Sequence, residues 1–244
     1  MSTIPETSNP ANHDLRSLRV ASYNIRKALG TDRRRDPARV LRVIADLGAD
    51  VVALQEADLR LGPRRPVFER DEVFRRTGLL PVDFDHGRES LGWHGNALLV
   101  SPGFEVISRS HHDLPGLEPR GLVSALLARG DQRLRVVGVH LGLLRHSRRR
   151  QLSALLDMLP EEDNTAMLIA GDFNERSLQV GLGRLSKRFR ILAGGPTYHS
   201  RHPVFALDRI AISDRFTEAE ASVYRSHEAS RASDHLPLLA DLRL

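Results

Sequence analysis

Short apolar runs that end on a polar or charged side chain are the feature of this sequence that most constrains its fold. Residues 50–56 read Asp-Val-Val-Ala-Leu-Gln-Glu and finish on Glu56, and residues 166–171 are apolar throughout and are followed by Asp172. Short apolar runs bounded by turn signals predict buried β-strands. We therefore expect a buried sheet whose strand ends carry polar side chains.

Helical patterns alternate with these runs. Asp36 is expected to cap a helix that has Pro37 at its first position and closes at Gly48. Further helices are expected over residues 69–76 and over residues 147–159, where four leucines fall on one face. The remaining predicted strands cover residues 18–25, 95–101, 104–108, 121–129, 134–140, 206–213 and 235–242.

The number and spacing of these elements predict a layered protein. We count about eight to ten strands and three or four helices, which suits a strand-rich core covered by helices, in α/β or α+β packing. An alternating βα barrel fits worse, because several neighbouring strands leave no room for a helix between them. The chain has 244 residues, 41% of them hydrophobic, and no internal repeat. We therefore expect a polar, disordered lead-in over residues 1–16 and a single domain over residues 17–244.

Composition narrows the function. The chain has no cysteine, which removes disulfides, thiolate catalysis and cysteine–zinc sites. It also lacks an apolar run long enough to cross a bilayer and the apolar centre of a signal peptide, so together with the missing cysteines we expect a location in the cytoplasm. We also expect a monomer. The net charge of +5 favours polyanionic partners such as nucleic acid or anionic phospholipid. Only Lys27 and Lys187 are lysines, however, and such an arginine skew is equally consistent with a GC-rich coding sequence.

Polar residues gather where strands begin or end, and together they predict an active site. Taken singly, each has a structural explanation as a turn residue, a helix cap, a core histidine or an ion-pair partner. So many at strand ends are hard to explain that way, because a buried unpaired carboxylate is costly and active sites of α/β proteins form at strand ends. The candidates are Asn24, Glu56, His140, Asp172, Asn174, Asp208, Asp234 and His235.

The residue types indicate a reaction class. Oxygen and amide ligands without cysteine suit a hard cation such as Mg²⁺ or Mn²⁺. Two histidines among carboxylates suit acid–base work or charge stabilisation around a phosphate. The sequence has neither a Gly-rich phosphate loop nor a Gly-x-Ser-x-Gly elbow, so nothing indicates a kinase, a dehydrogenase or a serine hydrolase. We therefore expect a metal-dependent hydrolase of phosphoesters.

These motifs resemble, in order, those of the endonuclease/exonuclease/phosphatase superfamily, and the resemblance spans residues 20–242. Glu-Pro-Arg-Gly at 118–121 is similar to the compact bacterial subgroup. The matching segments are Ser-Tyr-Asn-Ile at 22–25, Leu-Gln-Glu at 54–56, Gly-Asn-Ala-Leu-Leu-Val at 95–100, Val-His-Leu at 139–141, Gly-Asp-Phe-Asn-Glu at 171–175, Leu-Asp-Arg-Ile at 207–210 and Ser-Asp-His-Leu-Pro at 233–237.

The resemblance implies a fold and a metal site. The fold would be a DNase I-like four-layer α/β/β/α sandwich, with two packed β-sheets flanked by helices. Glu56 would be the principal metal ligand, with Asn24 and Asp234 contributing directly or through water.

It also implies roles around the phosphate. His235, oriented by Asp208, would be the acid–base or phosphate-stabilising histidine. Asp172 would hold and activate the attacking water with help from Asn174, and His140 would hydrogen-bond the phosphoryl oxygens. The residues leave open which group is the general base and whether one metal or two are bound.

Two further residues are substrate-binding candidates with a structural alternative. Arg120 begins a predicted strand and is expected either to hold a substrate phosphate or to be one more surface arginine. Asn96 matches a position near the family's site, but it also suits a turn-closing role after Gly95.

The resemblance favours a phosphodiesterase without fixing its substrate, because relatives hydrolyse DNA, RNA, phospholipid head groups and inositol phosphates. A nuclease would use basic loops, and a lipid hydrolase would use exposed apolar loops. The alternative class is a non-catalytic binding protein on the same fold; it is disfavoured because every expected position holds a chemically competent residue. The basic candidates are Arg33 to Arg35, Arg64, Arg65 and Arg148 to Arg150, and the apolar ones are Leu91 to Trp93, Leu143 and Leu144.

Overall fold

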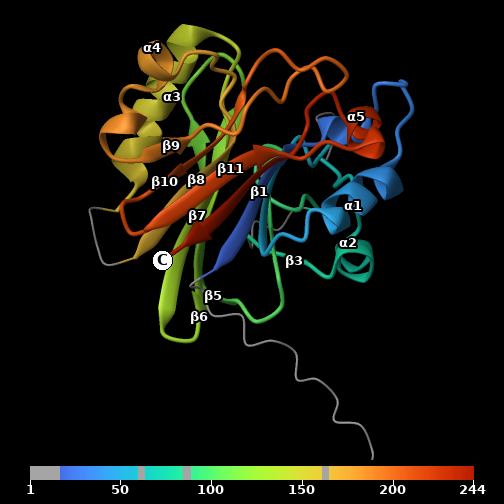
Figure 1. Ribbon diagram of the computed structural model, residues 1–244, viewed down its shortest axis with the longest axis horizontal. Coiled ribbons are helices and arrows are strands. Elements are labelled where there is room, and N and C mark those ends of the chain that lie inside the picture. Colours follow the sequence, from blue (N-terminus) through green and yellow to red (C-terminus); the bar gives the residue numbers. More distant parts are fainter. Residues whose placement is uncertain (1–16, 60–63, 85–88, 161–164) are drawn as a thin grey trace, which may run out of the picture.

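Two six-stranded β-sheets lie between two layers of helices (Figure 1). The computed structural model describes residues 17–59, 64–84, 89–160 and 165–244, so the expected lead-in falls outside the described residues. The first sheet has the order β11-β12-β1-β2-β4-β3 and the second the order β5-β6-β7-β8-β10-β9. The expected four-layer α/β/β/α sandwich is therefore confirmed.

The element bounds follow the predicted pattern closely in the central strands. The first sheet comprises β1 (Leu18–Asn24), β2 (Val51–Gln55), β3 (Leu80–Pro81), β4 (Ala97–Val100), β11 (Glu218–Val223) and β12 (Leu238–Arg243). The second comprises β5 (Glu105–Leu114), β6 (Arg120–Arg129), β7 (Gln132–His140), β8 (Ala166–Asp172), β9 (Arg190–Leu192) and β10 (Asp208–Ile212).

Helices cover the outer face of each sheet (Figure 1). One outer layer contains α1 (Pro37–Asp46), α2 (Arg70–Thr77) and α5 (His227–Ala232), and the other contains α3 (Arg145–Met158) and α4 (Leu178–Leu182). Two 3₁₀ turns, η1 (Arg26–Ala28) and η2 (Leu185–Lys187), complete the described elements. Among the described residues, no helix is both long and apolar enough to span a bilayer.

The apolar side chains divide into three cores, one for each interface between layers. The central core lies between the sheets and includes Val20 and Leu98 from one sheet and Val136 and Ile210 from the other. The other two cores join each sheet to its helices. The sheets approach closely at Gly138 of β7, where an added Cβ would lie 3.2 Å from Leu98 Cδ2 and 3.0 Å from Val123 Cγ2. Such close packing between sheets holds the strand ends in fixed relative positions.

The predicted start of α1 is confirmed in detail. Asp36 is the N-cap, and its Oδ1 accepts a hydrogen bond of 2.9 Å from the backbone N–H of Arg39. Pro37 occupies the first helical position, where its missing N–H costs nothing. The apolar stripe of the helix, including Val40 and Ile44, is buried against the first sheet.

The sequence prediction failed at the sheet edges. The described residues form more strands than the expected eight to ten, because β3, β9 and β11 were missed. β3 and β9 are too short to leave a pattern, and β11 is an edge strand whose side chains alternate between exposed and half-buried. The edge strand β5 extends to Leu114, beyond the predicted end at residue 108. The prediction stopped early because the second half of β5 carries charged and polar side chains, as edge strands often do.

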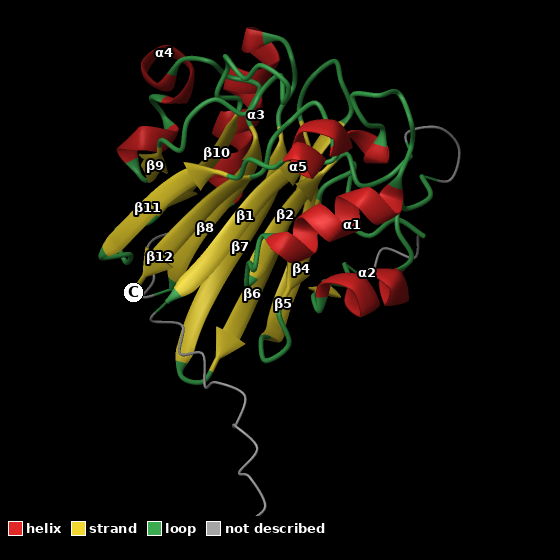
Figure 2. Ribbon diagram, turned by 45° about the vertical axis from the view of Figure 1, so that its right-hand side comes forward, coloured by secondary structure: helices red, strands yellow, loops and turns green. Residues whose placement is uncertain are grey.

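Strand register brings the candidate residues to one end of the sandwich. β7 and β8 are parallel with His140 beside Asp172, and β10 is antiparallel to β8 with Asp208 also beside Asp172. In the first sheet β1 and β2 are parallel, with Asn24 beside Gln55. The C-terminal ends of β1, β2, β7 and β8 and the N-terminal end of β10 all lie at the upper end of the molecule in Figure 2.

Leu98→Ala tests the importance of the central core. Leu98 is fully buried between the sheets, so the truncation should lower the free energy of unfolding by about 2–5 kcal/mol through lost transfer energy and the cavity left behind. Ile107→Ala on β5 is the matched control: Ile107 is 43% exposed, and its truncation should change stability by about 0.5 kcal/mol or less. Urea unfolding measures both. Equal losses in the two variants would contradict the assignment of the core.

Candidate active site

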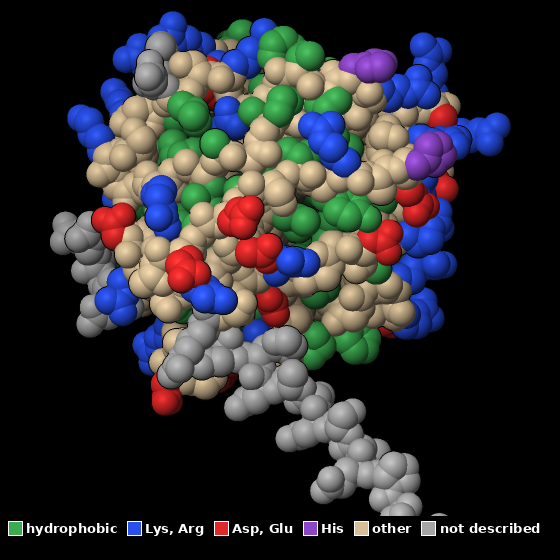
Figure 3. All heavy atoms as spheres, in the orientation of Figure 1, with side chains coloured by type: hydrophobic (Ala, Val, Ile, Leu, Met, Phe, Trp, Pro, Cys, Tyr) green, Lys and Arg blue, Asp and Glu red, His purple; other side chains and the backbone are tan. Residues whose placement is uncertain are grey.

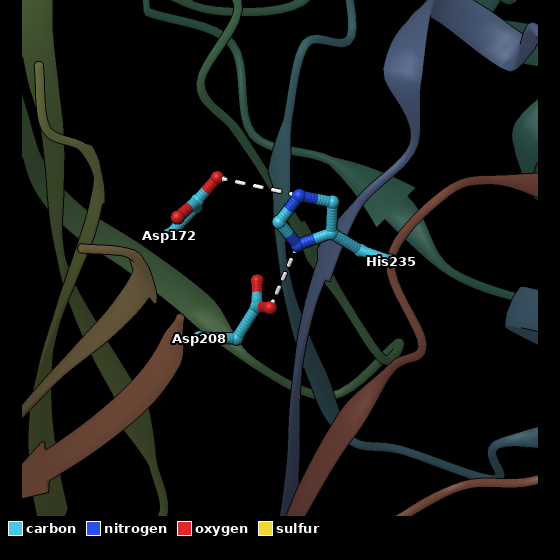
Figure 4. A group of neighbouring side chains, drawn as sticks. All are labelled: Asp172, Asp208 and His235. Atoms are coloured by element: carbon cyan, nitrogen blue, oxygen red, sulfur yellow. Dashed lines mark hydrogen bonds and ion pairs between the residues drawn. The ribbon is translucent and has the colours of Figure 1, made fainter. Parts of the chain in front are cut away.

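A buried Asp–His–Asp arrangement lies at this end of the sandwich (Figure 4). His235 Nδ1 is 2.8 Å from Asp208 Oδ2, and its Nε2 is 3.7 Å from Asp172 Oδ2. Asp172 ends β8 and Asp208 begins β10, while His235 enters from the loop before β12 of the other sheet. The two sheets therefore both contribute to one site.

The neighbours of Asp208 fix the orientation of His235. Thr197 Oγ1 donates a hydrogen bond of 2.5 Å to Asp208 Oδ2, the oxygen that also accepts from His235 Nδ1. The ring of Tyr198 packs against the His235 ring with centroids 5.0 Å apart. The imidazole is thus held by a carboxylate on one nitrogen and by an aromatic face, with Nε2 directed to Asp172.

The two carboxylates change the acidity of His235. Burial alone would lower its pKa, but the charges on Asp208 and Asp172 outweigh burial and raise the pKa to about 10. Burial also raises the pKa of Asp172, against the opposing effects of the His235 charge and the hydrogen bonds to Asp172. The arrangement therefore holds a proton on His235 Nε2, next to a carboxylate.

Asp172 receives donors from both sheets. Its Oδ2 accepts a hydrogen bond of 3.0 Å from Asn24 Nδ2, and its Oδ1 accepts one of 2.9 Å from the backbone N–H of Asn174. His140 Nε2 lies 3.4 Å from the same Oδ2. The structure thus places Asn24, His140, Asn174 and His235 around one buried carboxylate. Hydrogen bonds to an ionised group are stronger than those between neutral groups, so the donors from Asn24 and Asn174 hold this carboxylate firmly.

Arg120 is buried behind His140, so the reading of it as a surface arginine was wrong. Its Nη1 lies 3.0 Å from His140 Nδ1, and its Nη2 donates to Glu118 Oε2 at 2.8 Å. A guanidinium can only donate, so Nδ1 of His140 must accept and the ring proton must sit on Nε2. Arg120 therefore sets the tautomer that directs an N–H of His140 to the site.

The expected metal ligands lie around the turn η1. Glu56 follows β2 and its Oε2 contacts Lys27 Nζ, while Asp234 Oδ2 is 3.3 Å from Arg26 Nε. Asn24 Oδ1 accepts from the backbone N–H of Arg26 at 3.1 Å. Carboxylate and amide oxygens are the donors that a hard divalent cation prefers, so the chemistry of this set fits Mg²⁺ or Mn²⁺.

A second set of atoms is also close enough to hold a metal. One ligand atom each from Asp172, Asp208 and His235 lie within 4.8 Å of one another. A histidine must be neutral to bind a metal, however, and here both carboxylates favour the protonated ring. We therefore favour the oxygen donors around Glu56 as the metal ligands, with the Asp–His–Asp set acting on protons and charge.

The structure supports the turn-closing alternative for Asn96. Its Nδ2 donates to the carbonyls of Trp93 at 3.0 Å and of Gly121 at 2.9 Å, so the side chain ties the loop before β4 to the start of β6. Gly121 directly follows Arg120, which contacts His140, so Asn96 supports the backbone next to the site. Substrate binding by Asn96 stays a prediction.

The predictions of a basic surface and of an apolar surface for the substrate were each partly wrong. Arg148 was included among the basic loop residues, but its side chain is only 11% exposed and Nη2 pairs with Glu175 at 2.9 Å. Leu91 was counted in an apolar loop but is buried, and Trp93 Nε1 donates to Asp113 Oδ1 at 2.8 Å. Leu143 and Leu144, after His140, are exposed as the lipid reading requires.

Sequence reasoning missed Thr197, Tyr198, Arg26 and Lys27. Thr197 and Tyr198 lie in the long connection between β9 and β10, where no periodic pattern marks a functional position. Lys27 did carry a signal, because one of only two lysines stands three residues after Asn24. The meaning of that position depends on contacts across strands, which the sequence alone does not show.

Asp208→Asn tests the origin of the His235 pKa. Removing the Asp208 charge should lower that pKa from about 10, so the imidazole should lose its proton at lower pH than in the wild type. NMR of the imidazole C–H signals in metal-free protein follows this directly. Asp214→Asn, on an exposed aspartate, is the matched control and should leave the titration unchanged. An unaltered His235 titration in Asp208→Asn would show that Asp208 does not hold the charge.

Comparison with known proteins identifies the fold and the family. The endonuclease/exonuclease/phosphatase from Beutenbergia cavernae is 21% identical with a TM-score of 0.72, over 94% of this chain and 72% of its own. The one from Bacteroides vulgatus is 17% identical with a TM-score of 0.73, over 93% and 99%. Truncated Caenorhabditis elegans TDP2 is 16% identical with a TM-score of 0.72, over 95% and 100%.

Sequence identities this low show a shared fold and nothing about a shared activity. No curated protein matches the chain. The sequence model of the Endonuclease/Exonuclease/phosphatase family, however, matches residues 21–235 and so includes every candidate site residue. The chain therefore belongs to the endonuclease/exonuclease/phosphatase family.

Proposed function

We propose that this protein hydrolyses phosphoesters, and phosphodiesters above all, with Mg²⁺ or Mn²⁺ as its cofactor. The observation that carries the proposal is the buried carboxylate of Asp172, which has Asn24, His140 and His235 within 3.0, 3.4 and 3.7 Å of one oxygen. In-line attack on phosphorus needs an oriented water and donors for the phosphoryl oxygens. The Asp172 carboxylate would orient the water, and the donors around it would bind the phosphoryl oxygens.

The cation would be held by Glu56 with help from Asn24 and Asp234. It would supply positive charge to the phosphate and to the leaving oxygen. Asn24 ends β1, Glu56 follows β2, and Asp234 lies in the loop before β12. The first sheet would therefore supply the metal site. The second sheet, with His140, Asp172 and Asp208, would supply most of the acid–base groups.

His235 and Asp172 would handle the proton. His235 carries a proton on Nε2 when cationic, and Asp208 stabilises that charge through Nδ1. Asp172 would orient the attacking water through its carboxylate, and the backbone N–H of Asn174 keeps that carboxylate in place. Because His235 already carries a proton on each nitrogen, the Asp172 carboxylate would accept the proton released by the water.

His140 would stabilise the charge that develops on the phosphoryl oxygens. Arg120 holds the ring with its proton on Nε2, the nitrogen that faces the site. Donors fixed before the reaction need no reorganisation during it, which is why such groups contribute strongly to catalysis. In this proposal Arg120 is first of all a positioning residue for His140.

The substrate is proposed to be a nucleic acid or an anionic phospholipid. Exposed arginines at positions 33–35, 149 and 150 suit a polyanion, whereas the exposed Leu143 and Leu144 directly after the His140 strand suit a lipid. On the face shown in Figure 3, Lys and Arg side chains are scattered among acidic and apolar ones. A screen of both substrate classes is therefore needed.

A non-catalytic binding protein on the same fold is the alternative. Loss of function would be expected to remove or misplace at least one reactive group. Here His235 Nδ1 is hydrogen-bonded to Asp208, and its Nε2 lies 3.7 Å from Asp172, so all three reactive groups are present and close together. This geometry favours the enzyme.

Hydrolysis of bis(p-nitrophenyl) phosphate tests the proposed activity. We expect turnover that requires Mg²⁺ or Mn²⁺, stops with EDTA, and falls by about 10²–10⁴-fold in His235→Ala because a proton-transfer group is lost. His227→Ala, an exposed histidine on α5, is the matched control and should keep wild-type turnover. Full activity in His235→Ala would contradict the assigned role, and metal-independent hydrolysis would contradict the cofactor.

A further inference from the structure

The turn η1 places two positive side chains on the two carboxylates assigned to the metal. Lys27 Nζ contacts Glu56 Oε2, and Arg26 Nε lies 3.3 Å from Asp234 Oδ2. The pair of Lys27 and Glu56 is the less exposed, with side chains 24% and 17% accessible. The site described above leaves these cations unexplained.

Backbone hydrogen bonds tie Lys27 to Glu56 independently of the side chains. The N–H of Ile25 donates to Gln55 O and the N–H of Lys27 donates to Glu56 O, both at 3.0 Å. The pairing of β1 with β2 thus continues beyond the strands into the turn. The backbone of Lys27 is therefore held next to Glu56 whichever rotamer the lysine side chain adopts.

The backbone of this region is strained in a way that a simple connection does not need. Arg26, Lys27 and Ala28 have φ of 47°, 55° and 56°, and Glu56 has φ of 55°. Non-glycine residues rarely adopt this left-handed conformation, and clusters of such residues are typical of functional sites. The strained turn positions the side chains of Arg26 and Lys27 at the carboxylates.

A metal on Glu56 and the ammonium of Lys27 exclude each other electrostatically. A mostly buried carboxylate needs a counter-charge, and Lys27 supplies it in the metal-free protein. A divalent cation on either oxygen of Glu56 would lie within a few ångströms of the ammonium, and two positive charges at that distance repel strongly. Binding of the metal must therefore move Lys27 away from Glu56.

We propose that Lys27 is a built-in cation that occupies Glu56 in the metal-free protein and competes with the divalent metal for it. This inference rests on the proposed function, because it takes Glu56 as a metal ligand. Lys27 then sets the metal affinity: the protein keeps its site charge-balanced without metal and binds the ion more weakly than the same ligands would alone.

Binding of Mn²⁺, followed by the EPR signal of the free ion at a fixed neutral pH, tests the competition. Lys27→Met should bind Mn²⁺ more tightly than the wild type, on the order of five-fold, which corresponds to an ion pair of about 1 kcal/mol. Lys187→Met removes the same charge from an exposed site on η2, so it corrects for the change in net charge and should leave the affinity unaltered. Glu56→Gln should lose most of the affinity.

Chemical labelling gives a second readout that needs neither activity nor the Lys27→Met variant. In Lys187→Arg, Lys27 is the remaining lysine of the chain. Its acetylation by acetic anhydride, quantified by mass spectrometry, should be slow in EDTA and several-fold faster with saturating Mn²⁺, because the ammonium has left Glu56. In Lys187→Arg combined with Glu56→Gln, labelling should be fast with or without Mn²⁺.

The outcomes separate this inference from the proposed function. Equal Mn²⁺ affinity in Lys27→Met and the wild type, with labelling of Lys27 unaffected by Mn²⁺, would overturn the competition while metal-dependent hydrolysis still stood. Failure of every variant to bind Mn²⁺, together with absence of hydrolysis, would overturn the proposed function and this inference with it. Tighter binding in Lys27→Met and metal-dependent labelling would support the competition.

Discussion

The buried carboxylate of Asp172 is the group on which the arrangement of this site depends. Removing a carboxylate from water is costly unless donors replace the water. Here the replacement comes from Asn24 of the first sheet, the backbone of Asn174, and the two histidines. Because these groups belong to both sheets, the site forms only when the sandwich is fully packed. The central core thus determines the catalytic geometry as well as the stability.

Charge balance links the proposed acid–base groups to the proposed metal ligands. His235 carries its proton against Asp208 and Asp172, and Lys27 and Arg26 lie against Glu56 and Asp234. Each of these four carboxylates thus has a positively charged side chain of the protein close by. In the proposed mechanism a divalent metal would take the place of Lys27 on Glu56 and raise the positive charge of the site by one, which would favour binding of an anionic substrate. The proposed charge balance would account for the turn next to β2, whose residues adopt an unfavourable left-handed backbone conformation.

The strand ends were predictable from sequence because burial forces a simple pattern there. Residues 51–54 and 166–171 are apolar; the first run leads through Gln55 to Glu56 and the second is followed directly by Asp172. Neighbouring strands bring their own polar end residues to the same end of the sheet. The edges were not predictable: β11 and the outer half of β5 face solvent on one side, so their composition resembles that of loops. Contacts between distant segments were also out of reach, such as Thr197 on Asp208 and Lys27 on Glu56. No local pattern encodes them, since they depend on the register between strands.

The position of the metal distinguishes most directly between the oxygen ligands around Glu56 and the Asp–His–Asp set. Crystals of the protein grown with Mn²⁺ would locate the ion by its anomalous scattering. We expect an anomalous peak at the Glu56 carboxylate, with Lys27 moved away and His235 still hydrogen-bonded to Asp208. A peak within bonding distance of a His235 ring nitrogen, among Asp172 and Asp208, would contradict Glu56 as the principal metal ligand.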